Sequence, residues 1–102
     1  MRNLSREQLL AELRALKPQF EGEGVFHMSL FGSRARGDNR PNSDVDVVVD
    51  IQHGRRFGLE AAGVFNLIED HIGLRSSIVT RQGLLSDPSF RARVSQDEVA
   101  VF

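Results

Sequence analysis

The sequence of 102 residues contains no cysteine, no tryptophan and no tyrosine. Without cysteine, disulfide bonds, thiolate zinc sites and a cysteine nucleophile are all excluded. Without tyrosine, the chain cannot be modified on a tyrosine of its own. No apolar run is long enough for a signal peptide or a membrane span, so we expect a cytoplasmic protein with no membrane partner.

Lysine is also scarce, because Lys17 is the one lysine among 13 basic residues and the others are arginines. The 14 acidic residues bring the formal net charge to −1. The pI near 6.3 and the lack of aromatic residues among the arginines argue against a nucleic-acid partner. With 40% hydrophobic and 26% charged residues, the composition is that of a globular chain, and its length predicts one domain over residues 1–102.

Hydrophobic spacing predicts alternating helices and strands. Ser5 and Gln8 have capping-box spacing, and leucines at helical intervals then predict a helix over residues 5–17, followed by a turn at 21–24. Further helices are expected at 61–72 and 88–94, and strands at 25–31, 44–51 and 76–80. Residues 34–43 are expected to form an exposed loop or a single helical turn, and residues 52–56 a loop. Residues 99–102 are either a last strand or an interface patch.

Two aspartates form the first candidate site. Asp44 and Asp46 lie two residues apart on a predicted strand, so both carboxylates project from one face, about 7 Å apart along the backbone. Like charges held this close favour a divalent cation between them, and carboxylate oxygens favour Mg²⁺ or Mn²⁺ over zinc. The alternative is a pair of surface acids on an edge strand, where charge opposes aggregation.

Gly32 and Ser33 directly follow a predicted buried strand. A glycine lets a phosphate approach the backbone closely, main-chain N–H groups at such a turn can point at an anion, and the serine hydroxyl adds a donor. A plain connecting loop is the alternative. However, ten residues separate Ser33 from Asp44, and a triphosphate site beside a metal-binding pair is what nucleotidyl transfer requires.

The segments LFGSRARG at residues 30–37 and NSDVDVVV at residues 42–49 resemble the motif of the minimal nucleotidyltransferases of the polymerase-β superfamily. The resemblance implies an α/β (α+β) fold of polymerase-β type, with helices packed on a small mixed β-sheet. It also implies metal-dependent transfer of a nucleoside monophosphate, expected to be AMP from ATP, to a hydroxyl group.

Many members of this family are antitoxins encoded beside a HEPN-domain toxin, and they resemble enzymes that attach AMP to a tyrosine of that toxin. The resemblance therefore implies a HEPN toxin as the protein partner. The sequence is also compatible with a homo-oligomer.

The resemblance also assigns roles to residues. Asp44 and Asp46 would be the catalytic residues and the metal ligands. Gly32 and Ser33 would hold the β- and γ-phosphates, while Arg34 or Arg36 would neutralise the leaving pyrophosphate. The complete set of expected nucleotide-binding residues is Gly32, Ser33, Arg34, Arg36, Gly37 and Ser43.

In one respect the sequence departs from the family pattern. The predicted strand at 76–80 offers Ser77 where the family usually has a third aspartate, and a hydroxyl is a poor Mg²⁺ ligand and a poor base. Asp50, Asp70 or an acid of the partner could supply the charge instead. Two hypotheses stay open: an active nucleotidyltransferase that modifies a partner protein, and a catalytically degenerate antitoxin that neutralises its partner by binding. Transfer to a small molecule ranks third.

Overall fold

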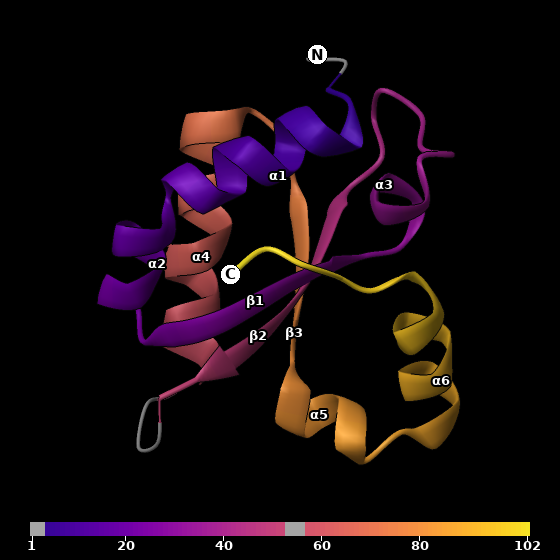
Figure 1. Ribbon diagram of the computed structural model, residues 1–102. Helices are drawn as coiled ribbons and strands as arrows, with labels where there is room; N and C mark the ends of the chain where they lie inside the picture. The colour runs from indigo at the N-terminus through magenta and orange to yellow at the C-terminus, as the bar shows by residue number, and fades with distance from the viewer. Residues whose placement is uncertain (1–3, 53–56) are drawn as a thin grey trace.

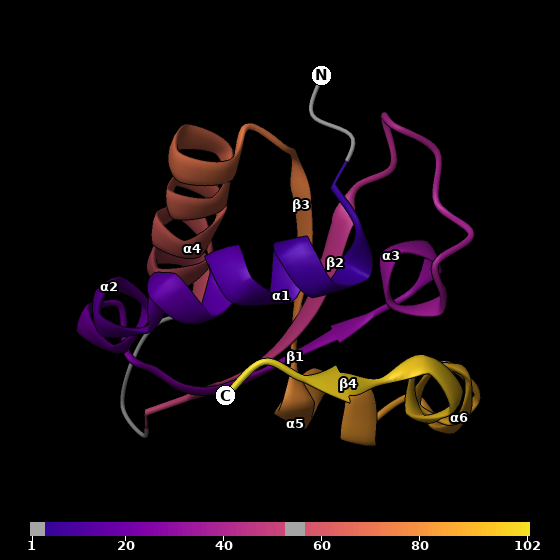
Figure 2. The same ribbon diagram turned by 45° about the horizontal axis from the view of Figure 1, so that its top comes forward.

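A computed structural model describes residues 4–52 and 57–102, with the backbone alone for residues 57–60. A sheet of four strands runs in the order β3-β2-β1-β4 (Figures 1 and 2). β1 pairs antiparallel with β2 and β4, whereas β2 and β3 are parallel, so the sheet is mixed as predicted. The strands are β1 (Val25–Phe31), β2 (Val45–Ile51), β3 (Ser76–Thr80) and β4 (Val99–Ala100).

Side-chain caps fix where several helices begin. The Ser5 hydroxyl accepts a hydrogen bond from the Gln8 N–H at 3.1 Å, and the Gln8 side chain accepts one from the Ser5 N–H at 2.9 Å, which confirms the predicted capping box. Asp87 caps the last helix by accepting from the Phe90 N–H at 3.1 Å. The helices are α1 (Arg6–Ala15), α2 (Lys17–Gly22), α3 (Ser33–Arg36), α4 (Phe57–Ile72), α5 (Arg81–Leu85) and α6 (Pro88–Asp97).

The structure differs from the predicted elements in several places. The first helix ends at Ala15, and a separate helix α2 occupies most of the predicted turn, because Pro18 is tolerated in a first helical turn. No pattern in the sequence predicted α5, because its five residues are too few for a helical repeat. The second predicted helix, expected at 61–72, is α4 and begins earlier, at Phe57. Residues 53–56 of the predicted loop before it lie outside the described residues.

Helices cover both faces of the sheet. In Figure 2, α1 and α4 lie above β1 in the view, and α5 and α6 lie below it. On the first face α1, α2 and α4 bury the larger core, which includes Leu13, Phe20 and Ile68. On the second face a smaller core consists of Phe31, Val48, Leu84 and Val94, with Val79 and Phe90 packed against it.

The second core corrects one expectation from the sequence. The alternation in β2 predicted a single apolar face, yet Val48, on the acidic face, is only 1% exposed because α5 and α6 pack over that part of the strand. Asp46, two residues earlier on the same face, lies beyond this core and is only half-buried. Within the described ranges, none of the helices is long and apolar enough to cross a membrane.

Candidate active site

The strand register brings the acidic pair beside the glycine turn. Asp46 is paired with Phe31 at the end of β1 and with Ser77 near the start of β3. Gly32 follows Phe31 directly, so the turn into α3 lies against the acidic end of β2 (Figure 1). Two motifs that are ten residues apart in the sequence therefore form one site.

Gly32 fits this place for two physical reasons. Its φ angle is +76°, in the left-handed region that favours glycine. A Cβ atom at this position would also overlap Oδ2 of Asp46. The bare Cα of Gly32 thus leaves the space that the Asp46 carboxylate occupies, and the chain comes close to the carboxylate without a side chain in between.

The two acids repel each other in a partly dry environment. Asp44 is exposed and Asp46 is half-buried. Burial raises the pKa of Asp46, and the negative charge of Asp44 raises it further, whereas Arg36 and Arg34 act in the opposite direction. A cation between the carboxylates would relieve this repulsion.

The donor set fits Mg²⁺ or Mn²⁺. Magnesium is commonly bound by one or two carboxylates, together with water and phosphate oxygens of the substrate. No group of three or more histidines, cysteines and acids within residues 4–52 and 57–102 is arranged to hold a metal. The described chain therefore offers two carboxylates, and phosphate oxygens and water would complete the coordination.

The two acids that could supply a third carboxylate, Asp50 and Asp70, lie apart from this pair. Ser77 is exposed and sits next to Asp46 on the neighbouring strand. Asp50 is four residues further along β2, and its Oδ1 lies 4.0 Å from Nε of Arg81. Asp70 is exposed on α4, which packs on the opposite face of the sheet. Neither acid joins Asp44 and Asp46.

The two candidate arginines have different surroundings. Arg34 is only 1% exposed, and it donates hydrogen bonds from Nε to the Ser43 carbonyl at 2.9 Å and from Nη2 to the Pro41 carbonyl at 3.1 Å. Its buried Nη1 has no hydrogen-bond partner. Burial lowers the pKa of Arg34, while Asp44 and then Asp46 counteract the shift. The side chain of Arg34 thus fastens the loop that leads into Asp44.

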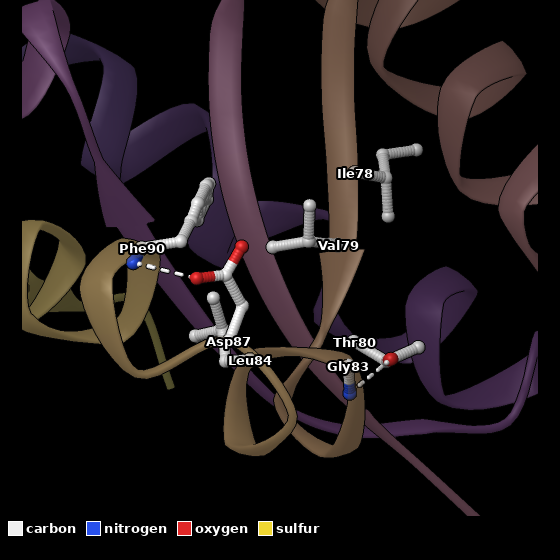
Figure 3. Close-up of a pocket in the computed structure, with 7 residues that line it drawn as sticks. All are labelled: Ile78, Val79, Thr80, Gly83, Leu84, Asp87 and Phe90. Carbon is white, nitrogen blue, oxygen red and sulfur yellow. Dashed lines mark hydrogen bonds between the residues drawn. The ribbon is translucent and has the colours of Figure 1, made fainter.

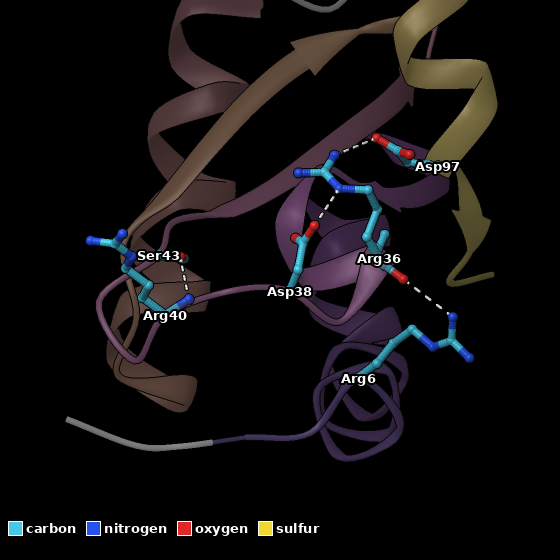
Figure 4. Close-up of polar contacts among 7 residues, drawn as sticks. Arg6, Arg36, Asp38, Arg40, Ser43 and Asp97 are labelled. Carbon is cyan, nitrogen blue, oxygen red and sulfur yellow. Dashed lines mark hydrogen bonds and ion pairs between the residues drawn. The ribbon is translucent and has the colours of Figure 1, made fainter.

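Arg36, in contrast, is at the surface. Its Nε donates to Oδ2 of Asp38 at 3.1 Å and its Nη1 to Oδ2 of Asp97 at 2.7 Å (Figure 4). These hydrogen bonds raise the pKa of Arg36, so its charge is permanent. Because the Asp38 side chain is 62% exposed, Arg36 can exchange that contact for a phosphate at small cost, whereas its contact with Asp97, which is 17% exposed, is more protected from water.

Gly37 and Ser43 shape the loop between α3 and β2. Gly37 ends α3 with a φ angle of +87°. The Ser43 hydroxyl accepts a hydrogen bond from the main-chain N–H of Arg40 at 2.9 Å (Figure 4). Arg6 of α1 steadies the same region by donating to the carbonyl of Ala35 at 3.2 Å. Gly37 and Ser43 therefore both have a structural role in this loop, and their contact with a nucleotide stays a prediction.

A cavity of about 190 Å³ opens beside Gly32 and Arg36. Helix α6 contributes Phe90, Arg93 and Asp97 to its lining. Sequence reasoning missed these residues, since the pattern of α6 does not show which part of the sheet the helix covers. We call this space the β1 cavity, because Phe31 of β1 also lines it.

Comparisons with known proteins identify the family of this chain. Residues 6–100 match the sequence model of the nucleotidyltransferase domain. The chain is 32% identical over 87 residues to protein adenylyltransferase MntA of Thermococcus cleftensis, across 84% of this chain and 87% of that protein.

Two solved structures share the fold. One, described as a minimal nucleotidyltransferase, has a TM-score of 0.79 and 30% identity over 97% of this chain and 98% of its own. A toxin–antitoxin structure with AMP-PNP has a TM-score of 0.64 and 18% identity over 97% of this chain and 73% of its own. The fold expected from the motif is thereby confirmed, and the chain belongs to the minimal nucleotidyltransferases of the nucleotidyltransferase-domain family.

Proposed function

We propose that this protein transfers AMP from ATP, with Mg²⁺ or Mn²⁺, to a hydroxyl group of a partner protein, and that it acts as the antitoxin of a HEPN-domain toxin. The observation that carries the proposal is the close approach of Gly32 to the Asp46 carboxylate. It puts a turn suited to phosphate against a pair of acids suited to a divalent metal. The similarity to a protein adenylyltransferase supports AMP as the transferred group.

Each residue has a role in this reaction. Gly32 and Ser33 contact the β- and γ-phosphates, Arg36 neutralises the leaving pyrophosphate, and Asp44 and Asp46 hold the metal. When bound, the metal neutralises charge on the phosphates and orients them for in-line displacement. A bond forms between the acceptor oxygen and the α-phosphorus, the bond from that phosphorus to the pyrophosphate oxygen breaks, and the acceptor proton passes to water.

The second candidate function is neutralisation by binding alone. It is favoured by Ser77, which stands beside Asp46 without the charge of a third acid. A degenerate enzyme of this kind would still bind its partner, and it could still bind ATP through the glycine turn.

One experiment separates the two functions. The protein, the product of the neighbouring gene, ATP and Mg²⁺ are incubated together, and both chains are weighed by mass spectrometry. Transfer predicts a gain of one AMP on the partner. If the acceptor is a tyrosine, this chain gains none, because it contains no tyrosine. The gain should vanish in Asp44→Asn and persist in Asp70→Asn, a matched change on the opposite face of the sheet. A stable complex without any gain supports neutralisation by binding.

A further inference from the structure

β3 lies at one end of the sheet and is paired on one side only. In the order β3-β2-β1-β4 its neighbour is β2. The Val45 N–H donates to the Arg75 carbonyl at 2.9 Å, where β2 and β3 begin to pair. In a parallel ladder this bond turns the backbone N–H and carbonyl groups of Ser76, Ile78 and Thr80 away from β2. We call this outward side of the strand the β3 edge.

The opposite edge of the sheet is protected. β4 has only two residues, Val99–Ala100, and Arg14 of α1 donates hydrogen bonds to the Ala100 and Val101 carbonyls at 3.1 and 2.8 Å. Short strands and charged side chains are common ways to prevent pairing at an edge. β3, in contrast, has five residues without a charge or a proline, and three of them are β-branched. The β3 edge is therefore the side of the sheet at which another strand can be added.

An apolar cavity of about 310 Å³ opens beside the β3 edge (Figure 3). Its lining includes Leu84 of α5 and Phe90 of α6, together with Ile78 and Val79 of β3. In Figure 3 the side chains of Ile78 and Val79 lie on opposite sides of the strand, so the cavity extends to the edge between them. A strand added at this edge would remove apolar surface from water as well as extend the ladder.

The β3 edge is complementary to a second copy of itself. Two antiparallel β3 strands related by a twofold axis at Ile78 pair Ile78 with its own counterpart, and Ser76 with Thr80 of the other copy. These are the three residues whose backbone groups point outward, so N–H groups and carbonyls meet across the axis. The Ile78 side chain is half-buried against the larger core, and its remaining surface would contact the second Ile78.

A hydroxyl group without a partner supports the same pairing. The buried Oγ of Ser76 has no hydrogen-bond partner. The residue opposite it in the second copy is Thr80, whose Oγ1 accepts the Gly83 N–H at 2.9 Å (Figure 3). The hydroxyl proton of Thr80 is then free to donate. Serine and threonine at directly opposed positions form such hydrogen bonds between antiparallel strands.

Charge does not oppose this contact. The strand itself is uncharged, and Arg75 and Arg81, which flank it, would face each other across the axis. Arg81 is already ion-paired with Glu98, and its Nε lies 4.0 Å from Oδ1 of Asp50. These two carboxylates offset its positive charge, so the repulsion from Arg75 is small.

We propose that two copies of this chain associate through the β3 edge, with Ile78 on the twofold axis, and form one continuous sheet. The axis is perpendicular to that sheet, so Asp44 and Asp46 of both copies face the same side of it. Because these acids belong to β2, an interface through β3 leaves them accessible. The dimer forms whether or not the protein transfers AMP. The competing occupant of the β3 edge is an extended segment of a different protein.

Hydrogen exchange of the unaltered protein tests where the interface lies. Sedimentation velocity should give twice the chain mass of 11.4 kDa at high concentration and the chain mass after dilution. The Ile78 N–H should exchange slowly in the dimer and faster after dilution, because its acceptor lies in the second copy. The Val79 N–H points toward β2 and should stay protected throughout. A chain that is monomeric at every concentration, or a dimer whose Ile78 N–H is unprotected, would overturn the proposal.

Two lysine variants test the same interface by mutation. Ile78→Lys puts like charges on the twofold axis and should raise the dissociation constant of the dimer by about tenfold or more. Ala100→Lys adds the same charge at an exposed position of β4 and should leave the dissociation constant unchanged. Should Ile78→Lys fail to fold, Ile78→Pro removes the outward N–H, which an edge strand tolerates. Equal dissociation constants for the two lysine variants would contradict an interface at β3.

The product of the neighbouring gene separates the two occupants of the β3 edge. Protection of the Ile78 N–H that depends on the concentration of this chain alone supports the dimer. If the Ile78 N–H becomes protected only after the other protein is added, the edge binds that protein and the proposed self-association is wrong.

Discussion

The buried guanidinium of Arg34 holds the carbonyl oxygen of Ser43 at 2.9 Å from its Nε, and Ser43 immediately precedes Asp44. With the second bond, from Nη2 to Pro41, this side chain fixes the last part of the loop before β2. The orientation of Asp44 therefore depends on an arginine that does not reach the surface. Arg36, two residues later, faces the β1 cavity instead.

This difference predicts that the same substitution affects stability at Arg34 and ATP affinity at Arg36. Arg34→Lys keeps the charge but cannot make both hydrogen bonds, so the free energy of unfolding should fall by about 2 kcal/mol. Arg36→Lys replaces an exposed side chain, and its effect on stability should stay within about 0.5 kcal/mol. Urea unfolding gives the stabilities, and calorimetry gives the ATP affinity, which Arg36→Lys should weaken. Equal losses of stability in both variants would contradict the assignment.

The contact between Gly32 and Asp46 predicts a second pair of variants. Gly32→Ala imposes strain at a positive φ angle and a clash with the Asp46 carboxylate. Gly37→Ala imposes the same kind of strain at φ +87°, but its new Cβ would meet no atom within 4 Å. The free energy of unfolding should therefore fall by about 1 kcal/mol more in Gly32→Ala, and Mg²⁺ binding should weaken in that variant alone. Similar Mg²⁺ affinities in the two alanine variants would show that Gly32 is not close to the acids in solution.

A third prediction concerns the stability at low pH. The hydrogen bond from Arg81 to Glu98 lowers the pKa of Glu98 below its ordinary value. A carboxyl whose pKa is depressed by folding stabilises the protein above its unfolded pKa, and the contribution is lost as the pH falls through the folded pKa. Thermal melts should find Glu98→Gln less stable than the parent at neutral pH, and the difference should shrink toward zero in acid. Glu69→Gln, on the exposed face of α4, should show no such trend, and a difference that is constant with pH would contradict the pairing.

The sequence predicted the parts of the site that are set locally. The strand at 25–31 and the glycine after it belong to one continuous segment, and the alternation of β2 put Asp44 and Asp46 on one face. The sequence could not show which of Arg34 and Arg36 is buried, because α3 has only four residues and no repeat that indicates which side faces the core. Residues two apart in a helix point about 200° away from each other, so one arginine is buried when the other is exposed.

The residues that α6 contributes to the β1 cavity could not be predicted, because their position depends on tertiary packing. Phe90 and Arg93 line the β1 cavity because α6 packs over Phe31 and Val48. This packing uses the acidic face of β2, for which the sequence predicted no core. A single apolar residue among three aspartates, Val48, was the one local signal of a second core. It is too short a pattern to indicate which helix covers it.

The last prediction tests the position of Ser77 beside Asp46. Ser77→Asp places a third carboxylate next to the pair, and mutual repulsion should lower the melting temperature in the absence of divalent metal. Added Mg²⁺ should raise the melting temperature of Ser77→Asp by more than it raises that of the parent, since a ligand that binds only the folded state stabilises that state. If the protein is an enzyme, the rate of AMP transfer should also rise by about tenfold or more, because the new acid can accept the acceptor proton. Ser95→Asp adds the same charge at an exposed position of α6 and should change neither quantity. If added Mg²⁺ does not change the melting temperature of Ser77→Asp, the cation is not bound at this end of β2. The proposed role of Asp44 and Asp46 as metal ligands would then be wrong.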